Sequence, residues 1–88
     1  MMDDAKEKRP VLPLSLVMVG ETVEVVEMKE QGAVRQRLTE MGLTPGAVVR
    51  VVQSDTTGAM ILAVRHDARL AVGRSTARKI SVCLTNER

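Results

Sequence analysis

The chain has 88 residues, no Phe, Trp or Tyr, one cysteine and a formal net charge of +2. This length indicates a single domain, whose core is too small to enclose a large ligand pocket as well. The lone cysteine excludes an internal disulfide, and the lack of aromatics excludes aromatic grooves for proline-rich peptides and stacking platforms for single-stranded nucleic acid.

The N-terminal part predicts a tail followed by an apolar entry segment. Residues 1–11 mix both signs of charge without an apolar signal core, so we expect a disordered charged tail. Residues 12–17 are expected to pack across the domain with one short turn of helix. The longest apolar stretch, 11–19, is interrupted by Pro13 and Ser15 and is shorter than the roughly 20 residues of a membrane helix, which predicts a cytoplasmic protein.

Residues 22–28 predict the first long strand. Val23 and Val25 share one face, and the phase changes before Val26 and Met28, as it does at a β-bulge. Glutamates recur every third residue here, which would also fit one side of a helix. The bracketing glycines and the valines favour the strand.

Residues 33–41 predict the helix of the domain. Val34, Leu38 and Met41 fall at i, i+4 and i+7, which predicts one apolar stripe facing the core. Gly42 is the type of residue that ends a helix in a left-handed conformation.

The residues after the helix predict a sharp corner. We expect Leu43 to pack back on the last helical turn, Pro45 to fix its own φ and Gly46 to supply a positive φ. Gly42, Pro45 and Gly46 are therefore assigned a structural turn role.

The rest of the chain predicts short strands joined by close turns. Hairpin residues at 54–58 and a tight turn at His66 and Asp67 separate them. We expect these strands at residues 47–53, 59–65, 69–72 and 79–83, with residues 84–88 as a C-terminal tail. The pattern predicts a mainly β protein, a small barrel of about five strands with one short helix. An edge strand such as 59–65 could pair with a second copy, so a homo-oligomer is left open.

The sequence holds no recognisable catalytic constellation. His66 is the only histidine, so no histidine pair can hold a metal, and it is expected to be a surface turn residue. Cys83 has no base near it in sequence and fits a terminal or packed small apolar side chain. We therefore predict no enzyme activity, no metal site and no cofactor.

Residues 35–46 read Arg-Gln-Arg-Leu-Thr-Glu-Met-Gly-Leu-Thr-Pro-Gly. This run resembles the Arg-x-Arg-Leu-x-Glu-Φ-Gly-Φ-x-Pro-Gly run of the FeoA family, where Φ is apolar. The resemblance covers roughly residues 12–83 and departs from the family at 70–75, where a glycine precedes Arg74.

The resemblance implies an SH3-like barrel and an accessory protein of bacterial ferrous iron uptake. Such a protein would dock to the cytosolic GTP-binding domain of the membrane transporter FeoB, peripheral to the inner membrane through that partner. The same module resembles the C-terminal domains of iron- and manganese-dependent repressors, and a stand-alone relative of those domains is an alternative.

The helix and its corner are the candidate docking surface. Its candidate residues are Arg35, Arg37, Glu40, Met41 and Leu43. The alternative is that the apolar members fill the core and the arginines form a solvated face. A second function also stays open, because residues 31–83 carry eight basic and three acidic groups and could bind nucleic-acid phosphates.

Overall fold

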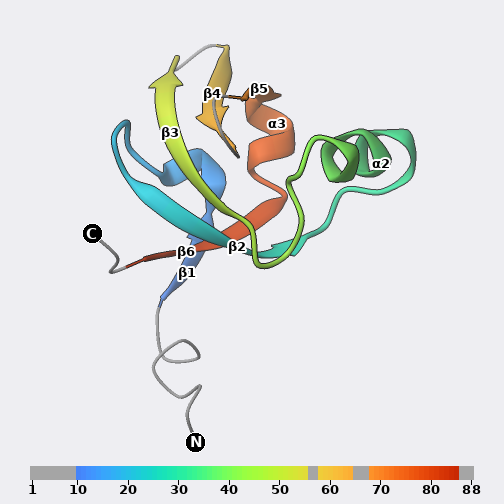
Figure 1. Cartoon of the computed structure of the whole chain (residues 1–88), viewed down its shortest axis with the longest axis horizontal. Coiled ribbons are helices and arrows are strands. Elements are labelled where there is room, and N and C mark those ends of the chain that lie inside the picture. The colour runs from blue at the N-terminus through green and yellow to red at the C-terminus, as the bar shows by residue number, and fades with distance from the viewer. Residues whose placement is uncertain (1–9, 56–57, 65–67, 86–88) are drawn as a thin grey trace, which may run out of the picture.

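The computed structural model describes residues 10–55, 58–64 and 68–85. Its elements, in chain order, are β1 (Val11–Pro13), the 3-10 turn η1 (Leu14–Leu16), β2 (Thr22–Met28), α2 (Gly32–Glu40), β3 (Val48–Ser54), β4 (Ala59–Ala63), β5 (Arg69–Gly73), α3 (Arg74–Ala77) and β6 (Ile80–Leu84). Figure 1 shows the strands curling around a common interior, with α2 to one side. Of the tails expected at 1–11 and 84–88, residues 1–9 and 86–88 lie outside the described residues, but Val11 belongs to β1 and Leu84 to β6. The turn expected at His66 and Asp67 also lies outside the described residues.

The strands form one six-stranded antiparallel sheet in the order β1-β6-β2-β3-β4-β5. This confirms the mainly β fold and adds a strand to the five expected. The extra strand, β1, is only three residues long and contains Pro13, so its sequence carries no strand pattern. It is defined by pairing with β6, where Val11 lies opposite Cys83.

The interpretation of residues 59–65 as an edge strand is wrong. Strand β4 lies between β3 and β5, so both of its backbone edges are already occupied. Among the described strands, β1 and β5 are the two edges of the sheet.

The bulge expected in the first long strand is present. The register of β2 against β6 shifts between Val25 and Glu27, which leaves Val26 as the extra residue. The bulge lets Val23, Val25 and Met28 all reach the core, whereas Val26 is exposed. The expectation that Val26 shares a face with Met28 is therefore wrong, because the inserted residue turns outward.

The core is entirely aliphatic and thioether, and none of the polar or charged residues described is buried. Val49 and Val51 of β3 point into it together with Met60 and Leu62 of β4, with the alternation of half-buried strands. Cys83 is a free thiol, 1% exposed, and packs as a small apolar side chain.

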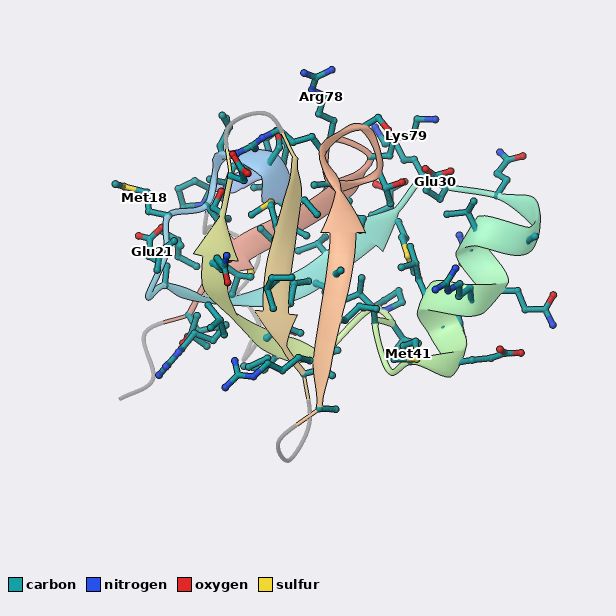
Figure 2. All side chains as sticks on the ribbon, turned by 90° about the horizontal axis from the view of Figure 1, so that it is seen from above. Met18, Glu21, Glu30, Met41, Arg78 and Lys79 are labelled. Atoms are coloured by element: carbon teal, nitrogen blue, oxygen red, sulfur yellow. The ribbon has the colours of Figure 1, made fainter. Side chains whose placement is uncertain are left out.

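The apolar stripe expected on α2 is buried at only one position. Leu38 is 5% exposed, whereas Val34 is 45% and Met41 40% exposed. The physical reason is that α2 stands beside the barrel and does not lie across it, so only one side chain reaches the core (Figure 2).

The end of α2 is closed by a backbone motif. The Gly42 N–H donates to the Thr39 carbonyl at 3.0 Å, and the Leu43 N–H donates to the Leu38 carbonyl at 2.9 Å. Gly42 has φ 97°, and this pair of bonds with a left-handed glycine is the Schellman arrangement. Leu38 and Leu43 then meet in the core, which ties the end of the helix to the barrel.

A type II turn follows directly. The Ala47 N–H donates to the Thr44 carbonyl at 2.9 Å, and Gly46 at the third position has φ 94°. The turn starts β3 in the register that pairs Val48 with Glu24 of β2.

Two glycine-to-alanine changes separate backbone strain from side-chain clashes. An added Cβ meets nothing within 4 Å at Gly46 or at Gly73, but Gly46 has φ 94° and Gly73 has φ −66°. We expect Gly46→Ala to lower the free energy of unfolding by about 1–3 kcal/mol and Gly73→Ala to raise it by a few tenths up to about 1 kcal/mol. Urea unfolding followed by far-UV circular dichroism measures both, since no aromatic fluorophore is present. Equal effects of the two changes would contradict the assignment of strain to Gly46.

Candidate partner-binding surface

Helix α2 is the most exposed regular element of the described chain. Every residue of Gly32–Glu40 except Leu38 is exposed. Figure 2 shows the helix to one side of the strands, with Met41 at its C-terminal end. A helix of nine residues is too short to be stable alone, so contacts at its ends must hold it.

Arg35 supplies one of these contacts. Its Nη1 atom donates to the Met28 carbonyl at 2.9 Å, in a part-buried position. The guanidinium therefore satisfies the last carbonyl of β2 and fixes the angle at which α2 leaves the sheet. The structural role of Arg35 is therefore to position the candidate surface, whereas contact with a partner is only its expected role.

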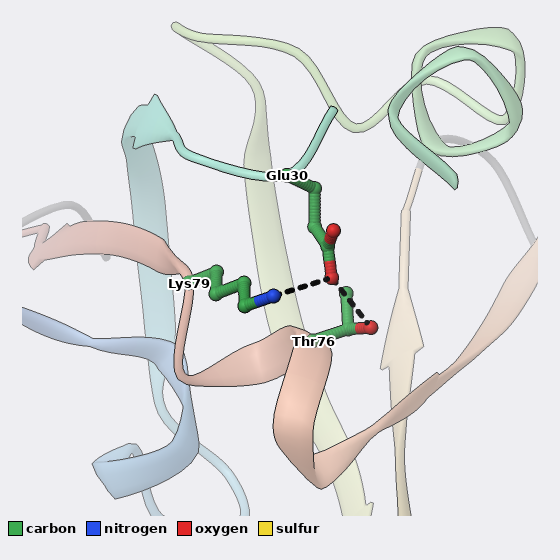
Figure 3. Close-up of polar contacts among 3 residues, drawn as sticks. All are labelled: Glu30, Thr76 and Lys79. Carbon is green, nitrogen blue, oxygen red and sulfur yellow. Dashed lines mark hydrogen bonds and ion pairs between the residues drawn. The ribbon is translucent and has the colours of Figure 1, made fainter. Parts of the chain in front are cut away.

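Glu30, Thr76 and Lys79 form a second contact, here called the acidic clasp (Figure 3). The Thr76 hydroxyl donates to Glu30 Oε2 at 3.1 Å, and Lys79 Nζ lies 3.9 Å from the same oxygen. The Glu30 side chain is 13% exposed and that of Lys79 57%, so the hydrogen bond contributes more than the long, solvated ion pair. The clasp joins the connection before α2 to α3, which lies 46 residues later in the chain.

The remaining candidate residues of the docking surface differ in their surroundings. Arg37 is exposed, and its side chain forms no hydrogen bond or ion pair with another described residue. Glu40 accepts a 3.4 Å hydrogen bond from Gln36 Nε2 on the same helix, and Met41 is 40% exposed. Leu43 is fully buried, so it offers no area to a partner and its expected place in the surface does not hold. The surface therefore consists of Arg35, Arg37, Glu40 and Met41, with Val34 as an exposed apolar neighbour that the sequence reasoning assigned to the core.

Arg74 forms a further contact set, here called the arginine clasp. Its guanidinium donates to the Ser15 carbonyl at 2.9 Å, to Ser54 Oγ at 3.0 Å and to the Asp55 carbonyl at 3.2 Å. One side chain at the start of α3 thus joins the 3-10 turn and the end of β3. This role of Arg74 could not be predicted from the sequence, because its acceptors are two backbone carbonyls and one hydroxyl that lie 19 to 59 residues away.

A groove separates α2 from the free edge of β5. Its volume is about 170 Å³. Its walls are Val34, Arg37 and Leu38 from α2, four residues of β5 from Leu70 to Gly73, and Thr76 of α3. The sequence could not predict this groove, because 36 residues separate Val34 from Leu70 and nothing in either segment indicates that they face each other.

Two features are absent from the described residues. No three His, Cys, Asp or Glu side chains gather there in a group that could hold a metal ion. No helix in the described part of the chain is long and apolar enough to cross a membrane.

Comparison with known proteins gives one family and one fold. The family model of the FeoA domain matches residues 12–83. The crystal structure of an iron uptake regulatory protein (FeoA) has a TM-score of 0.78 and 36% identity, over 86% of this chain and 100% of that one. The solution structure of a FeoA protein from Chlorobium tepidum has a TM-score of 0.74 and 26% identity, over 88% of this chain and 74% of that one.

A manganese-dependent transcriptional repressor shares the fold. Its TM-score is 0.77 at 19% identity, over 89% of this chain but only 44% of the repressor. This likeness extends to the small SH3-like domain alone. None of the curated proteins searched matches this sequence significantly.

Proposed function

This chain belongs to the FeoA family, and from that premise we propose that it is a non-catalytic accessory protein of bacterial ferrous iron uptake. We propose that it acts in the cytoplasm by docking to the cytosolic side of a FeoB-type transporter, and so lies at the inner membrane through that partner.

The observation that carries this proposal is the combination of firm anchoring and wide exposure in α2. The helix is fixed at its start by Arg35 and the acidic clasp and at its end by Leu38 and Leu43, yet all other side chains of the helix are exposed. Rigid, solvent-facing elements are the ones that bind a partner with little loss of conformational entropy.

The charges of the candidate surface can orient a partner protein on it. Arg37 and Glu40 lie one turn apart on α2, with Met41 directly after them, so the surface offers both signs of charge beside an exposed apolar side chain. A domain that acts through contact can regulate its partner only by binding one of the partner's states more tightly than another. A GTP-binding domain supplies two such states.

A titration of the isolated cytosolic domain of FeoB with matched arginine variants tests the proposal. We expect the parent chain to bind saturably and Arg37→Glu to bind about tenfold more weakly, because the reversal turns an attraction into a repulsion. Arg50→Glu makes the same change on the exposed face of β3 and is expected to shift the Kd by less than about twofold.

We choose Arg37 for the substitution because replacing Arg35 would also remove the hydrogen bond to the Met28 carbonyl and so disturb the position of α2. Equal losses for Arg37→Glu and Arg50→Glu would place the contact elsewhere on the domain. Absence of binding by the parent chain would remove the proposed partner.

A further inference from the structure

We propose that the groove between β5 and α2 binds an extended, acidic segment of a partner protein, which adds to the sheet as a further strand at the edge of β5. The inference rests on the proposed docking role and specifies the chemistry of the docked segment. It differs from that role in naming a strand edge, which the docking surface on α2 does not include.

The first observation is the free edge of β5. Strand β5 pairs with β4 on one side, and among the described residues no strand pairs with its other side. Figure 2 shows β5 with β4 on one side and α2 standing off the other. An edge of this kind presents backbone donors and acceptors that a partner strand can use.

The phase of the hydrogen bonds shows which residues present those groups. The Val64 N–H donates to the Ala68 carbonyl at 3.0 Å, and the register continues from there along β5. In an antiparallel ladder, residues alternate between bonding their neighbour and facing away from it. By this alternation from Ala68, Arg69 and Ala71 direct their backbone N–H and C=O groups outward, and Gly73 directs its N–H outward while its carbonyl begins α3.

The side chains on this edge leave room for another backbone. Ala71 and Gly73 are both exposed and are the two smallest residue types. A Cβ added to Gly73 meets nothing within 4 Å, so the face of the sheet is open at this end of β5. No large side chain at Ala71 or Gly73 stands over the position of an added strand, which lies about 4.8 Å from its neighbour in a sheet.

The groove beside the edge fits an apolar anchor. Its volume of about 170 Å³ is close to that of a cavity of about 150 Å³ that accommodates benzene. Val34 and Leu38 from α2 and Leu70 and Val72 from β5 form the apolar part of the groove, beside the polar groups of Arg37 and Thr76. A strand on the edge of β5 would insert one large apolar side chain there.

Charge selects an acidic partner segment. Among the described residues, Arg37 is the one charged residue that lines the groove, and the exposed Arg69 begins β5. A second copy of this chain, paired edge to edge, would bring two copies of Arg37 and Arg69 to one seam, which like-charge repulsion disfavours. A segment with carboxylates beside its apolar anchor complements both arginines.

Selection from a phage-displayed library of random dodecapeptides tests the proposal without assuming any natural partner. The parent chain is the bait, and retained peptides are counter-selected on Gly73→Pro. Proline fits the existing φ of −66° but removes the outward N–H. We expect the enriched peptides to share one large apolar residue flanked by Asp or Glu.

Matched variants locate the binding. Gly73→Pro is expected to bind the selected peptides at least about tenfold more weakly, because it removes a donor and fills the edge with a ring. Gly73→Ala keeps the donor and is expected to stay within about twofold of the parent. Arg37→Glu is expected to lose the acidic peptides, whereas Arg50→Glu is expected to keep them.

Amide hydrogen exchange on the parent chain gives a readout that needs no variant. A bound peptide should slow exchange at Arg69, Ala71 and Gly73, whose N–H groups would enter a new ladder. Failure to enrich any peptide, enrichment of basic peptides, or unchanged exchange at these three amides would overturn the proposal. A dimer in sedimentation equilibrium that Gly73→Pro abolishes would assign the edge to a second copy instead.

The outcomes separate this proposal from the docking role. The peptide selection contains no FeoB, so peptide binding at β5 can succeed while titration with FeoB fails. Conversely, FeoB binding that is sensitive to Arg37→Glu but not to Gly73→Pro would support docking on α2 and exclude strand addition.

Discussion

Replacing Leu43 by Ala is expected to lower the free energy of unfolding by about 2–5 kcal/mol. Leu43 is fully buried, and its backbone closes α2 through the 2.9 Å bond to the Leu38 carbonyl. The truncation leaves a cavity beneath the end of the helix in a core that has no aromatic side chains to rearrange into it. Because small domains have a total stability of about 5–15 kcal/mol, this one change removes a large share of it.

Met41→Ala is the matched control, two residues earlier in the same corner. Met41 is 40% exposed, so its truncation is expected to change the free energy of unfolding by no more than about 0.5–1 kcal/mol. Urea unfolding by far-UV circular dichroism measures both variants. If Leu43→Ala were as stable as Met41→Ala, Leu43 would not be the core residue described here.

Arg74→Ala is the second large effect, expected at about 2–4 kcal/mol of unfolding free energy. The side chain makes three hydrogen bonds from a charged donor, and such bonds contribute about 1.5–3 kcal/mol each without adding fully. Its loss frees two backbone carbonyls, of Ser15 and Asp55, and disconnects α3 from η1 and the end of β3. Core burial is untouched, so the cost comes from the lost bonds and not from a cavity.

The control for Arg74 is Arg78→Ala, at an exposed position that directly follows α3. It removes the same charge at a solvated position and is expected to stay within about 0.5 kcal/mol of the parent. Thermal unfolding at two salt concentrations separates charge from geometry, because a general charge effect would weaken with salt in both variants. Equal destabilisation of the two would indicate such a general effect and would contradict the arginine clasp.

The fold followed from the sequence where local pattern and tertiary position agree. The strands predicted at 47–53 and 59–65 are present as β3 and β4, and the phase change after Val25 correctly indicated a bulge. Both cases depend on the period of two that a half-buried strand imposes on its own residues. Structural features that depend on the spacing of residues within one strand can therefore be predicted from the sequence.

Features that join distant elements were not predictable. The stripe on α2 has helical spacing, but spacing does not tell whether the sheet lies beneath all three of its members, and only Leu38 is buried. Strand β1 exists through its partner β6, and β4 is interior because β5 pairs with it. Strand pairing and helix placement decide these outcomes, and the residue pattern of a short segment does not indicate either of them.

The candidate site shows the same division. The family run from Arg35 to Gly46 marks the helix and its corner, and four of the five residues singled out there lie at the surface. The edge of β5, the acidic clasp and the arginine clasp were missed, because each joins segments far apart in sequence. Leu43 was misplaced because an apolar residue after a helix serves equally as a core anchor or as a contact.

The proposed function requires contact with a nucleotide-switched partner, and a calorimetric titration of the FeoB cytosolic domain measures that contact directly. Loaded once with GDP and once with a non-hydrolysable GTP analogue, the domain should bind the parent chain saturably, with a different Kd in the two forms. Heat signals indistinguishable from dilution in both forms would contradict it.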